Sequence, residues 1–172
     1  DCKMQHSYNY NIPVLSYGGS ISTPAEGITG DVYVVSSLEE LDSNASKAKG
    51  KILVYSIPFI NYGQAVKYRF DGVNRAAKYG AIACLLRSIT PNYQTLHTGM
   101  MRYVDSLPKI PFGAITEQDA ALLGRLQARG VTPKLNLKLF NEQLEDAKSY
   151  NVVCELTGKS KADEFVAFGG HI

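Results

Sequence analysis

The stretch 50–88 constrains the fold of this chain more than any other. It contains two short runs, 52–55 and 81–86, that are apolar on nearly every residue. Such runs are typical of strands buried on both faces, as in a parallel sheet. Between them, 72–80 carries apolar residues at helical spacing and ends in Gly80, and glycine commonly ends helices because it adopts positive φ freely. The pattern predicts strand, helix and strand, which form one right-handed crossover unit.

The chain lacks the motifs that would make such a unit bind nucleotides or catalyse acyl transfer. Residues 158–160, Gly-Lys-Ser, match the end of the phosphate-loop motif, but Val153 occupies the position of the motif's first glycine. No Gly-x-Ser-x-Gly elbow occurs. The histidines His6, His97 and His171 are scattered and lack the spacing of a zinc site. A small hydrolase that uses His97 as its base remains one alternative.

Composition places the chain among ordinary globular domains. Its 172 residues are 45% hydrophobic and 20% charged, which suits a single domain with its own core. The formal net charge is +2 and no cluster of Lys and Arg occurs, so nothing favours a nucleic-acid partner. No apolar run approaches the about 18 residues of a membrane span. The start of the chain has neither a signal-peptide pattern nor an initiating methionine, which suggests processing or excision.

The remaining patterns predict further short strands, two more helices and two long loops. A capping box, Ser37 with Glu40, predicts the start of one helix, and a second helix is expected after Thr116. A proline in the first predicted strand marks it as an edge strand. The predicted strands are 12–15, 31–35, 110–115, 134–139, 151–156 and one that begins at 165, and the loops are 58–70 and 89–111. We therefore predict a mixed α/β fold with a β-rich core flanked by two to three helices.

The cysteines and one sequon bear on the compartment. Cys84 and Cys154 lie in apolar runs and are predicted to be buried free thiols, with a disulfide as the alternative. With Cys2 the count is odd, so at least one thiol stays unpaired. Asn44 begins the sequon Asn-Ala-Ser, which matters only if the chain enters the secretory pathway.

Two sets of motifs carry a family resemblance that covers about 12–172. The first resembles a protease-associated domain and consists of 50–55, 72–80 with the following 81–86, Ile110-Pro111 and 151–158. The second resembles the carboxypeptidase Q family of two-zinc exopeptidases and consists of 19–29, Ile60-Asn61-Tyr62 with Tyr68-Arg69, Leu86-Arg87-Ser88 and His97-Thr98-Gly99.

The resemblance implies a particular domain arrangement. Residues 1–11 would be a leading segment, 12–165 the protease-associated domain with a sandwich or open-barrel core of the swivelling β/β/α type, and 166–172 the start of a strand that returns to a catalytic domain. His171 matches the first zinc ligand of that family. The other ligands of the two zinc ions and the general base would follow after this chain. The resemblance therefore implies no catalytic residue and no cofactor in this chain alone.

The resemblance also implies a role as a lid over the active-site cleft. The expected partners are the protein's own catalytic domain, a peptide substrate and a second copy in a homodimer, in a secreted or lysosomal setting that would make Asn44 a glycosylation site. Arg can clamp a carboxylate and Tyr offers broad area with a polar tip, so six side chains of the two loops are candidates for facing a peptide. They are Tyr62, Tyr68, Arg69, His97, Arg102 and Tyr103. The alternative is a free-standing protease-associated module that binds peptides or cargo.

Overall fold

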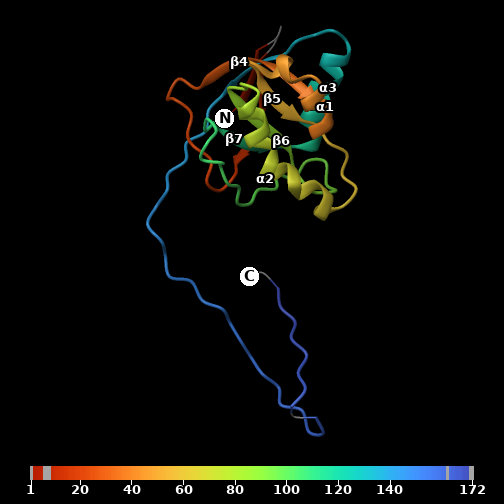
Figure 1. Cartoon of the computed structure of the whole chain (residues 1–172), viewed down its shortest axis with the longest axis vertical. Helices are drawn as coiled ribbons and strands as arrows, with labels where there is room; N and C mark the ends of the chain where they lie inside the picture. The colour runs from red at the N-terminus through yellow and green to blue at the C-terminus, as the bar shows by residue number, and fades with distance from the viewer. Residues whose placement is uncertain (1, 6–8, 162, 171–172) are drawn as a thin grey trace.

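The computed structural model describes residues 2–5, 9–161 and 163–170 (Figure 1). Within them, eight strands form one mixed sheet in the order β2-β1-β8-β4-β5-β6-β7-β3. The strands are β1 (Cys2–Gln5), β2 (Asn9–Ile12), β3 (Val14–Ser16), β4 (Ile28–Val35), β5 (Ile52–Tyr55), β6 (Ala83–Arg87), β7 (Phe112–Ile115) and β8 (Lys134–Leu137). The helices are α1 (Leu38–Ser43), α2 (Tyr62–Lys78), α3 (Glu117–Ala128) and a 3₁₀ turn at Ala45–Ala48. The predicted mixed α/β class is confirmed.

The centre of the sheet is the parallel set β4, β5, β6 and β7. Every residue of β5, β6 and β7 is buried, as expected of parallel strands covered on both faces. β5 and β6 pair in parallel, and α2 connects them along the chain. This confirms the predicted crossover unit. Helix and strand pack closely because Gly72 lies against the ring of Tyr55, whose hydroxyl donates to the Gly72 carbonyl at 3.0 Å.

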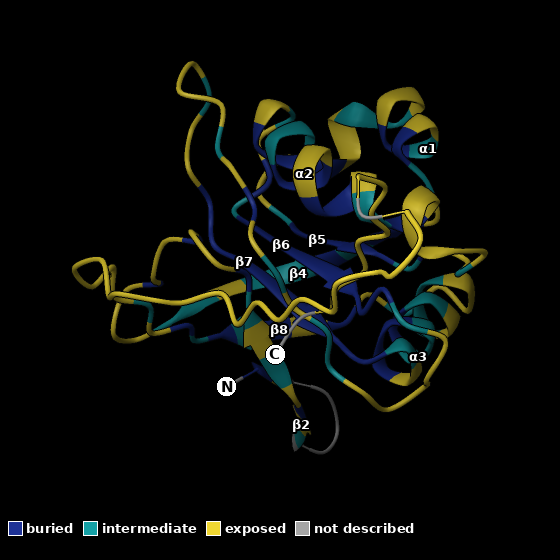
Figure 2. Cartoon of the chain, turned by 90° about the horizontal axis from the view of Figure 1, so that it is seen from below, coloured by how far each residue is buried: buried dark blue, intermediate teal, exposed yellow. Residues whose placement is uncertain are grey.

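The two faces of the sheet carry separate apolar clusters. Leu53 and Leu86 point to the face covered by α1 and α2, whereas Val54 and Leu85 point to the face covered by α3. This alternation follows from the period of two along a strand. Figure 2 shows α1 and α2 together on one side of the sheet and α3 apart from them.

The sheet continues on both sides with antiparallel strands. β8 pairs with β4 and with β1, so residues 2–5 of the predicted leading segment share the sheet. β3 pairs with β7 and ends the sheet, so the edge strand expected at 12–15 is confirmed for Val14 and Leu15, whereas Ile12 belongs to β2. Pro13 separates β2 from β3, because a proline nitrogen cannot donate to a ladder.

Helix α2 begins ten residues before the predicted start at Gly72. The prediction of a loop over 58–70 is therefore wrong from Tyr62 onward. Asn61 caps the helix, and its side-chain oxygen accepts a hydrogen bond of 2.9 Å from the Gln64 nitrogen. The sequence Asn-x-x-Gln at 61–64 carried this signal.

The predicted helix starts at Ser37 and Thr116 are confirmed. The Ser37 hydroxyl accepts from the Glu40 nitrogen at 3.0 Å, and Glu40 reaches back to the Ser36 nitrogen at 2.7 Å. Thr116 caps α3 by accepting from the Asp119 nitrogen at 3.0 Å. These contacts satisfy donors that the first helical turn leaves without partners.

The segment 140–170 departs from the sequence-based predictions. Its described residues contain no strand or helix, so the strands predicted at 151–156 and from 165 are wrong for this structure. Figure 1 shows the segment running far from the sheet and turning back. Cys154 is exposed, which corrects its predicted burial, whereas Cys84 is buried and free as predicted. The proposed domain limits at 165 and 166 stay predictions.

Candidate functional site

The candidate site lies where the parallel strands end. β5, β6 and β7 run the same way, so the segments that follow them meet at one edge of the sheet, the usual place for ligands in such folds. α2 follows β5 at this edge, and the long segment 89–111 follows β6. That segment contains no helix or strand, apart from a bridge between Met100 and Gly18, which confirms its predicted irregular character.

Three of the predicted lid residues come together here. Arg69 Nη1 on α2 donates to the Tyr62 hydroxyl at 3.1 Å. Tyr62 lies about two turns before Arg69 on the same helix. The ring of His97 meets the ring of Tyr62 edge to face, with centroids 5.7 Å apart. Gly99 lies directly against the Arg69 guanidinium, where an added Cβ would collide with it. We call Tyr17, Tyr62, Arg69, His97 and Gly99 the Arg69 cluster.

Tyr17 completes the cluster and was missed from sequence. It is buried against Phe112, with ring centroids 4.4 Å apart. The next residue, Gly18, donates its amide to the Gly99 carbonyl at 2.8 Å, which brings Tyr17 beside the segment that carries His97. Burial raises the pKa of the Tyr17 hydroxyl, and the positive charge of Arg69 opposes that rise. The two groups therefore interact electrostatically.

Ser88 fixes the backbone that carries His97. Its hydroxyl donates to the Ile115 carbonyl at 2.8 Å and accepts from the His97 nitrogen at 3.1 Å. Arg87, at the end of β6, is also buried and lies over the ring of Phe59 at 5.5 Å. Burial lowers the pKa of Arg87, because the charged form loses water. The motif at 86–88 thus serves to anchor the loop.

The other three predicted lid residues lie elsewhere. Tyr68 is buried against Tyr55 in the core face of α2. Tyr103 ties two backbone segments together, since its hydroxyl donates to the Ile110 carbonyl at 2.7 Å and accepts from the Ile21 nitrogen at 3.0 Å. Arg102 is exposed, and its carbonyl accepts from Asn74 at 2.9 Å. Their predicted contact with a peptide stays a prediction.

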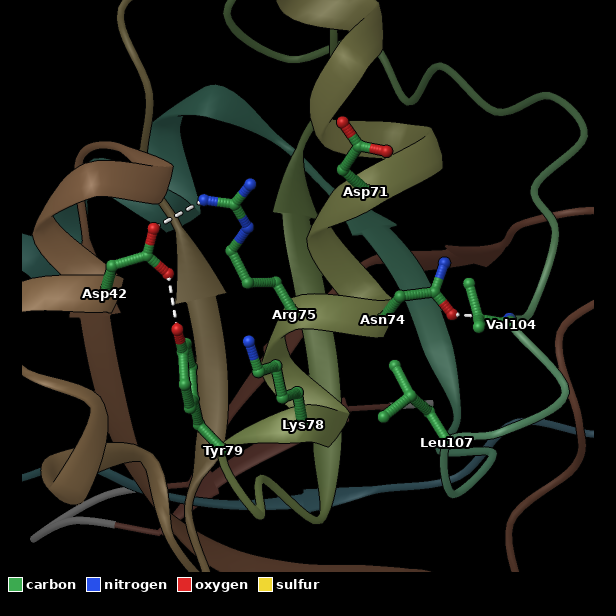
Figure 3. A pocket seen from close by; sticks show the side chains of 8 residues that line it. All are labelled: Asp42, Asp71, Asn74, Arg75, Lys78, Tyr79, Val104 and Leu107. Carbon is green, nitrogen blue, oxygen red and sulfur yellow. Dashed lines mark hydrogen bonds and ion pairs between the residues drawn. The ribbon is translucent and has the colours of Figure 1, made fainter.

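A hollow lies between α1, α2 and the segment 104–107 (Figure 3). Its volume is about 340 Å³, and it is lined mainly by polar residues. Asp42 pairs there with Arg75 at 2.6 Å and accepts from the Tyr79 hydroxyl at 2.8 Å. The hydrogen bond to Asp42 raises the pKa of Tyr79, because it stabilises the neutral phenol. This carboxylate is already partnered and joins α1 to α2.

The described residues do not form a metal site. Among them, no three His, Cys, Asp or Glu side chains lie close enough together to hold a metal ion. His171, the predicted zinc ligand, lies outside the described residues. Nor does any helix among them have the length and apolar character needed to cross a membrane.

The sequon at Asn44 lies at the end of α1. Its side chain is half-buried and donates from Nδ2 to the Glu40 carbonyl at 3.0 Å. Ser46, the third sequon residue, is exposed. Glycosylation of Asn44 stays a prediction.

Comparison with solved structures finds the fold of this chain within longer chains that are described as peptidases. No family model matches the chain. A peptidase M28 precursor from Shewanella amazonensis SB2B superposes with a TM-score of 0.74 at 29% identity, over 80% of this chain and 33% of that one. A zinc aminopeptidase from Bacillus subtilis shares the fold, with a TM-score of 0.53 at 18% identity over 80% of this chain and 29% of that one.

Among curated proteins, the chain matches carboxypeptidase Q. It is 45% identical to carboxypeptidase Q of Xenopus laevis over 163 residues, which are 94% of this chain. It is 42% identical to the human protein over 164 residues, which are 95% of this chain. The chain spans 35% of the length of these relatives. The resemblance to carboxypeptidase Q inferred from the sequence is confirmed.

Proposed function

We propose that this chain is the protease-associated part of a zinc exopeptidase of the carboxypeptidase Q type. In this proposal it covers the cleft of a catalytic domain and controls substrate access, without supplying a catalytic residue. The observation that carries the proposal is the identity of 40–45% to carboxypeptidase Q along nearly the whole chain. The TM-score of 0.74 to an M28 peptidase precursor supports it at the level of the fold.

The proposal assigns the chemistry to residues beyond this chain. His171 would be the first ligand of one of two zinc ions, and the remaining ligands would come from the catalytic domain. The partners would be that domain, a peptide substrate and a second copy of the protein. A secreted or lysosomal location would expose Asn44 to glycosylation.

The rigid part of such a lid is the parallel sheet, and the adaptable part is the segment 89–111. The Arg69 cluster lies where these meet, with Tyr62 about half exposed (46%). An exposed aromatic ring beside a guanidinium is well suited to contact a peptide, because Tyr and Arg combine apolar area with directed donors.

The test compares this chain with the full-length protein. The coding sequence beyond Ile172 should supply an Asp as the next residue and the other zinc ligands, and the full-length protein should bind zinc and hydrolyse dipeptides. This chain with zinc should show no turnover. Hydrolysis by this chain alone would refute the accessory role. A membrane span or RING sequence after Ile172 would instead support a free-standing protease-associated module.

A further inference from the structure

Unsatisfied polar atoms gather in one place. Three buried side-chain atoms of the described residues have no hydrogen-bond partner: the Tyr17 hydroxyl, Arg69 Nε and His97 Nδ1. All three belong to the Arg69 cluster. Leaving a buried polar group unpaired is costly, so such groups are rare and call for a physical reason.

The contacts within the cluster bring these groups together from three parts of the chain. Tyr62 bridges Arg69 and His97, since its hydroxyl accepts from Arg69 and its ring meets the His97 ring edge to face. Gly99 touches the guanidinium, and its carbonyl holds the residue that follows Tyr17. The side chains that carry the three unpaired atoms are thus connected through Tyr62, Gly99 and the Gly18–Gly99 hydrogen bond.

The charge at this place is also uncompensated. Arg69 is 9% exposed and forms no ion pair with any described residue. It faces the rings of Tyr62 and Phe70, with its Cζ 5.9 and 5.1 Å from their centroids. Ring faces offset only part of the cost of a buried cation. No described carboxylate offsets the rest of this cost.

We propose that the Arg69 cluster binds the carboxylate group of a peptide ligand. A guanidinium offers a planar fork that matches a carboxylate, and the neighbouring Tyr and His groups can donate further hydrogen bonds. The exposed Tyr62 ring marks the way in, and the adjacent segment 89–111 can adjust around the ligand. The proposal rests on the proposed function for its choice of a peptide, and it supplies the ligand chemistry of the lid.

Nuclear magnetic resonance of this chain tests the proposal directly, through the Nε–H signal of Arg69. Three probes are titrated: glycylglycine, with a free α-carboxylate; glycylglycinamide, with none; and aspartylglycinamide, with a side-chain carboxylate alone. We expect the Arg69 signal to move with a carboxylate probe and to stay in place with glycylglycinamide. Whichever carboxylate probe moves it identifies the source of the group. No response to either, or an equal response to glycylglycinamide, overturns the proposal.

Variants separate the cluster from general effects of charge. Arg69→Lys keeps the charge but loses the fork, so we expect the probe to bind at least about tenfold more weakly. Gly99→Ala removes no polar group but places a methyl where the guanidinium lies, so it should weaken binding as well. The matched control is Arg129→Lys, an exposed arginine at the end of α3 on the other side of the sheet. Unchanged binding in both cluster variants would contradict the proposal.

The exposed Tyr62 provides a variant that leaves the core intact. Tyr62→Phe removes the acceptor of Arg69 while it keeps the ring, and we expect binding about threefold to tenfold weaker, as for one hydrogen bond. Because these measurements use no zinc and no turnover, their failure would leave the proposed peptidase role standing. Failure of hydrolysis by the full-length protein would in turn leave a measured carboxylate site intact.

Discussion

Two stretches of this chain have the same alternating apolar pattern and opposite structures. In β8, Leu135 and Leu137 are completely buried, because the strand pairs with β4 on one side and β1 on the other. In 151–156, Val152 is 83% and Leu156 98% exposed, and the segment pairs with nothing that the structure describes. Alternation therefore predicts a strand only where a neighbouring strand and an apolar face are available.

The comparison also bears on the proposed function. The segment 140–170 carries large apolar side chains that stand in solvent, such as Tyr150, Val153 and Phe168. Exposed apolar side chains in such number are unusual for a folded domain. Under the proposed function, these side chains would pack against the catalytic domain.

Matched leucine truncations should give the largest contrast between the two regions. Leu85→Ala empties a fully buried position on β6, so we expect a loss of about 3 kcal/mol in the free energy of unfolding. Leu156→Ala removes the same atoms from an exposed position and should change that free energy by less than about 0.5 kcal/mol. Urea denaturation monitored by circular dichroism measures both. Equal losses would show that 151–156 is packed in solution.

Thiol reactivity provides a second contrast. Burial raises the pKa of Cys2 to about 12 and that of Cys84 well above its usual range. Since the thiolate is the reactive form, an aromatic disulfide reagent at pH 8 should modify exposed Cys154 about a hundredfold faster than either. After unfolding in guanidinium chloride, all three thiols should react with the reagent. Slow reaction of Cys154 in the native chain would contradict its exposure.

Local signals made the packed half of the chain largely predictable from sequence. The parallel strands were predicted because 52–55 and 81–86 are apolar throughout, and the caps because Ser37 and Thr116 directly precede helical patterns. The early start of α2 was missed because 58–70 was predicted to be a loop. Asn61 and Gln64 nevertheless form the capping signal there.

The candidate site was harder to predict, because it depends on which residues of α2 face the site and which face the core. Successive helical residues point about 100° apart, so Arg69 reaches the cluster while Tyr68 turns into the core. That distinction needs the helix start to be known. Tyr17 joins the cluster through the pairing of Gly18 with Gly99, a contact across 81 residues that no local pattern contains.

The cap of α2 allows a test of that missed start. Asn61→Ala removes the acceptor for the Gln64 nitrogen, and we expect a loss of about 1 kcal/mol in the free energy of unfolding. Asn61→Asp keeps an acceptor and serves as the matched control, with a change of less than about 0.5 kcal/mol. Thermal or urea unfolding measures both variants. An unchanged stability of Asn61→Ala would show that α2 begins later in solution.

The smallest difference in stability is expected between two ion pairs, one on the sheet and one in the segment 140–170. Asp31 on β4 pairs with Lys51 at 2.7 Å, and that hydrogen bond lowers the pKa of Asp31 below its ordinary value. Both side chains are about a third exposed, so water screens the pair and its contribution to stability is about 0.3 kcal/mol. Lys161 and Glu164 pair at 3.0 Å in the unpacked segment, with exposures of 70% and 72%.

The pH dependence separates these pairs. Because the folded state has the lower pKa, the contribution of Asp31 is complete above the unfolded value and is lost as the pH falls through the folded value. Asp31→Asn should therefore be slightly less stable than the parent near neutral pH, with the difference disappearing as the pH falls through the lowered pKa of Asp31, and also in high salt. Glu164→Gln should match the parent at every pH, because it adds no contact to the folded sheet. A pH-dependent loss in Glu164→Gln would indicate that the segment 140–170 contributes to the stability of the sheet.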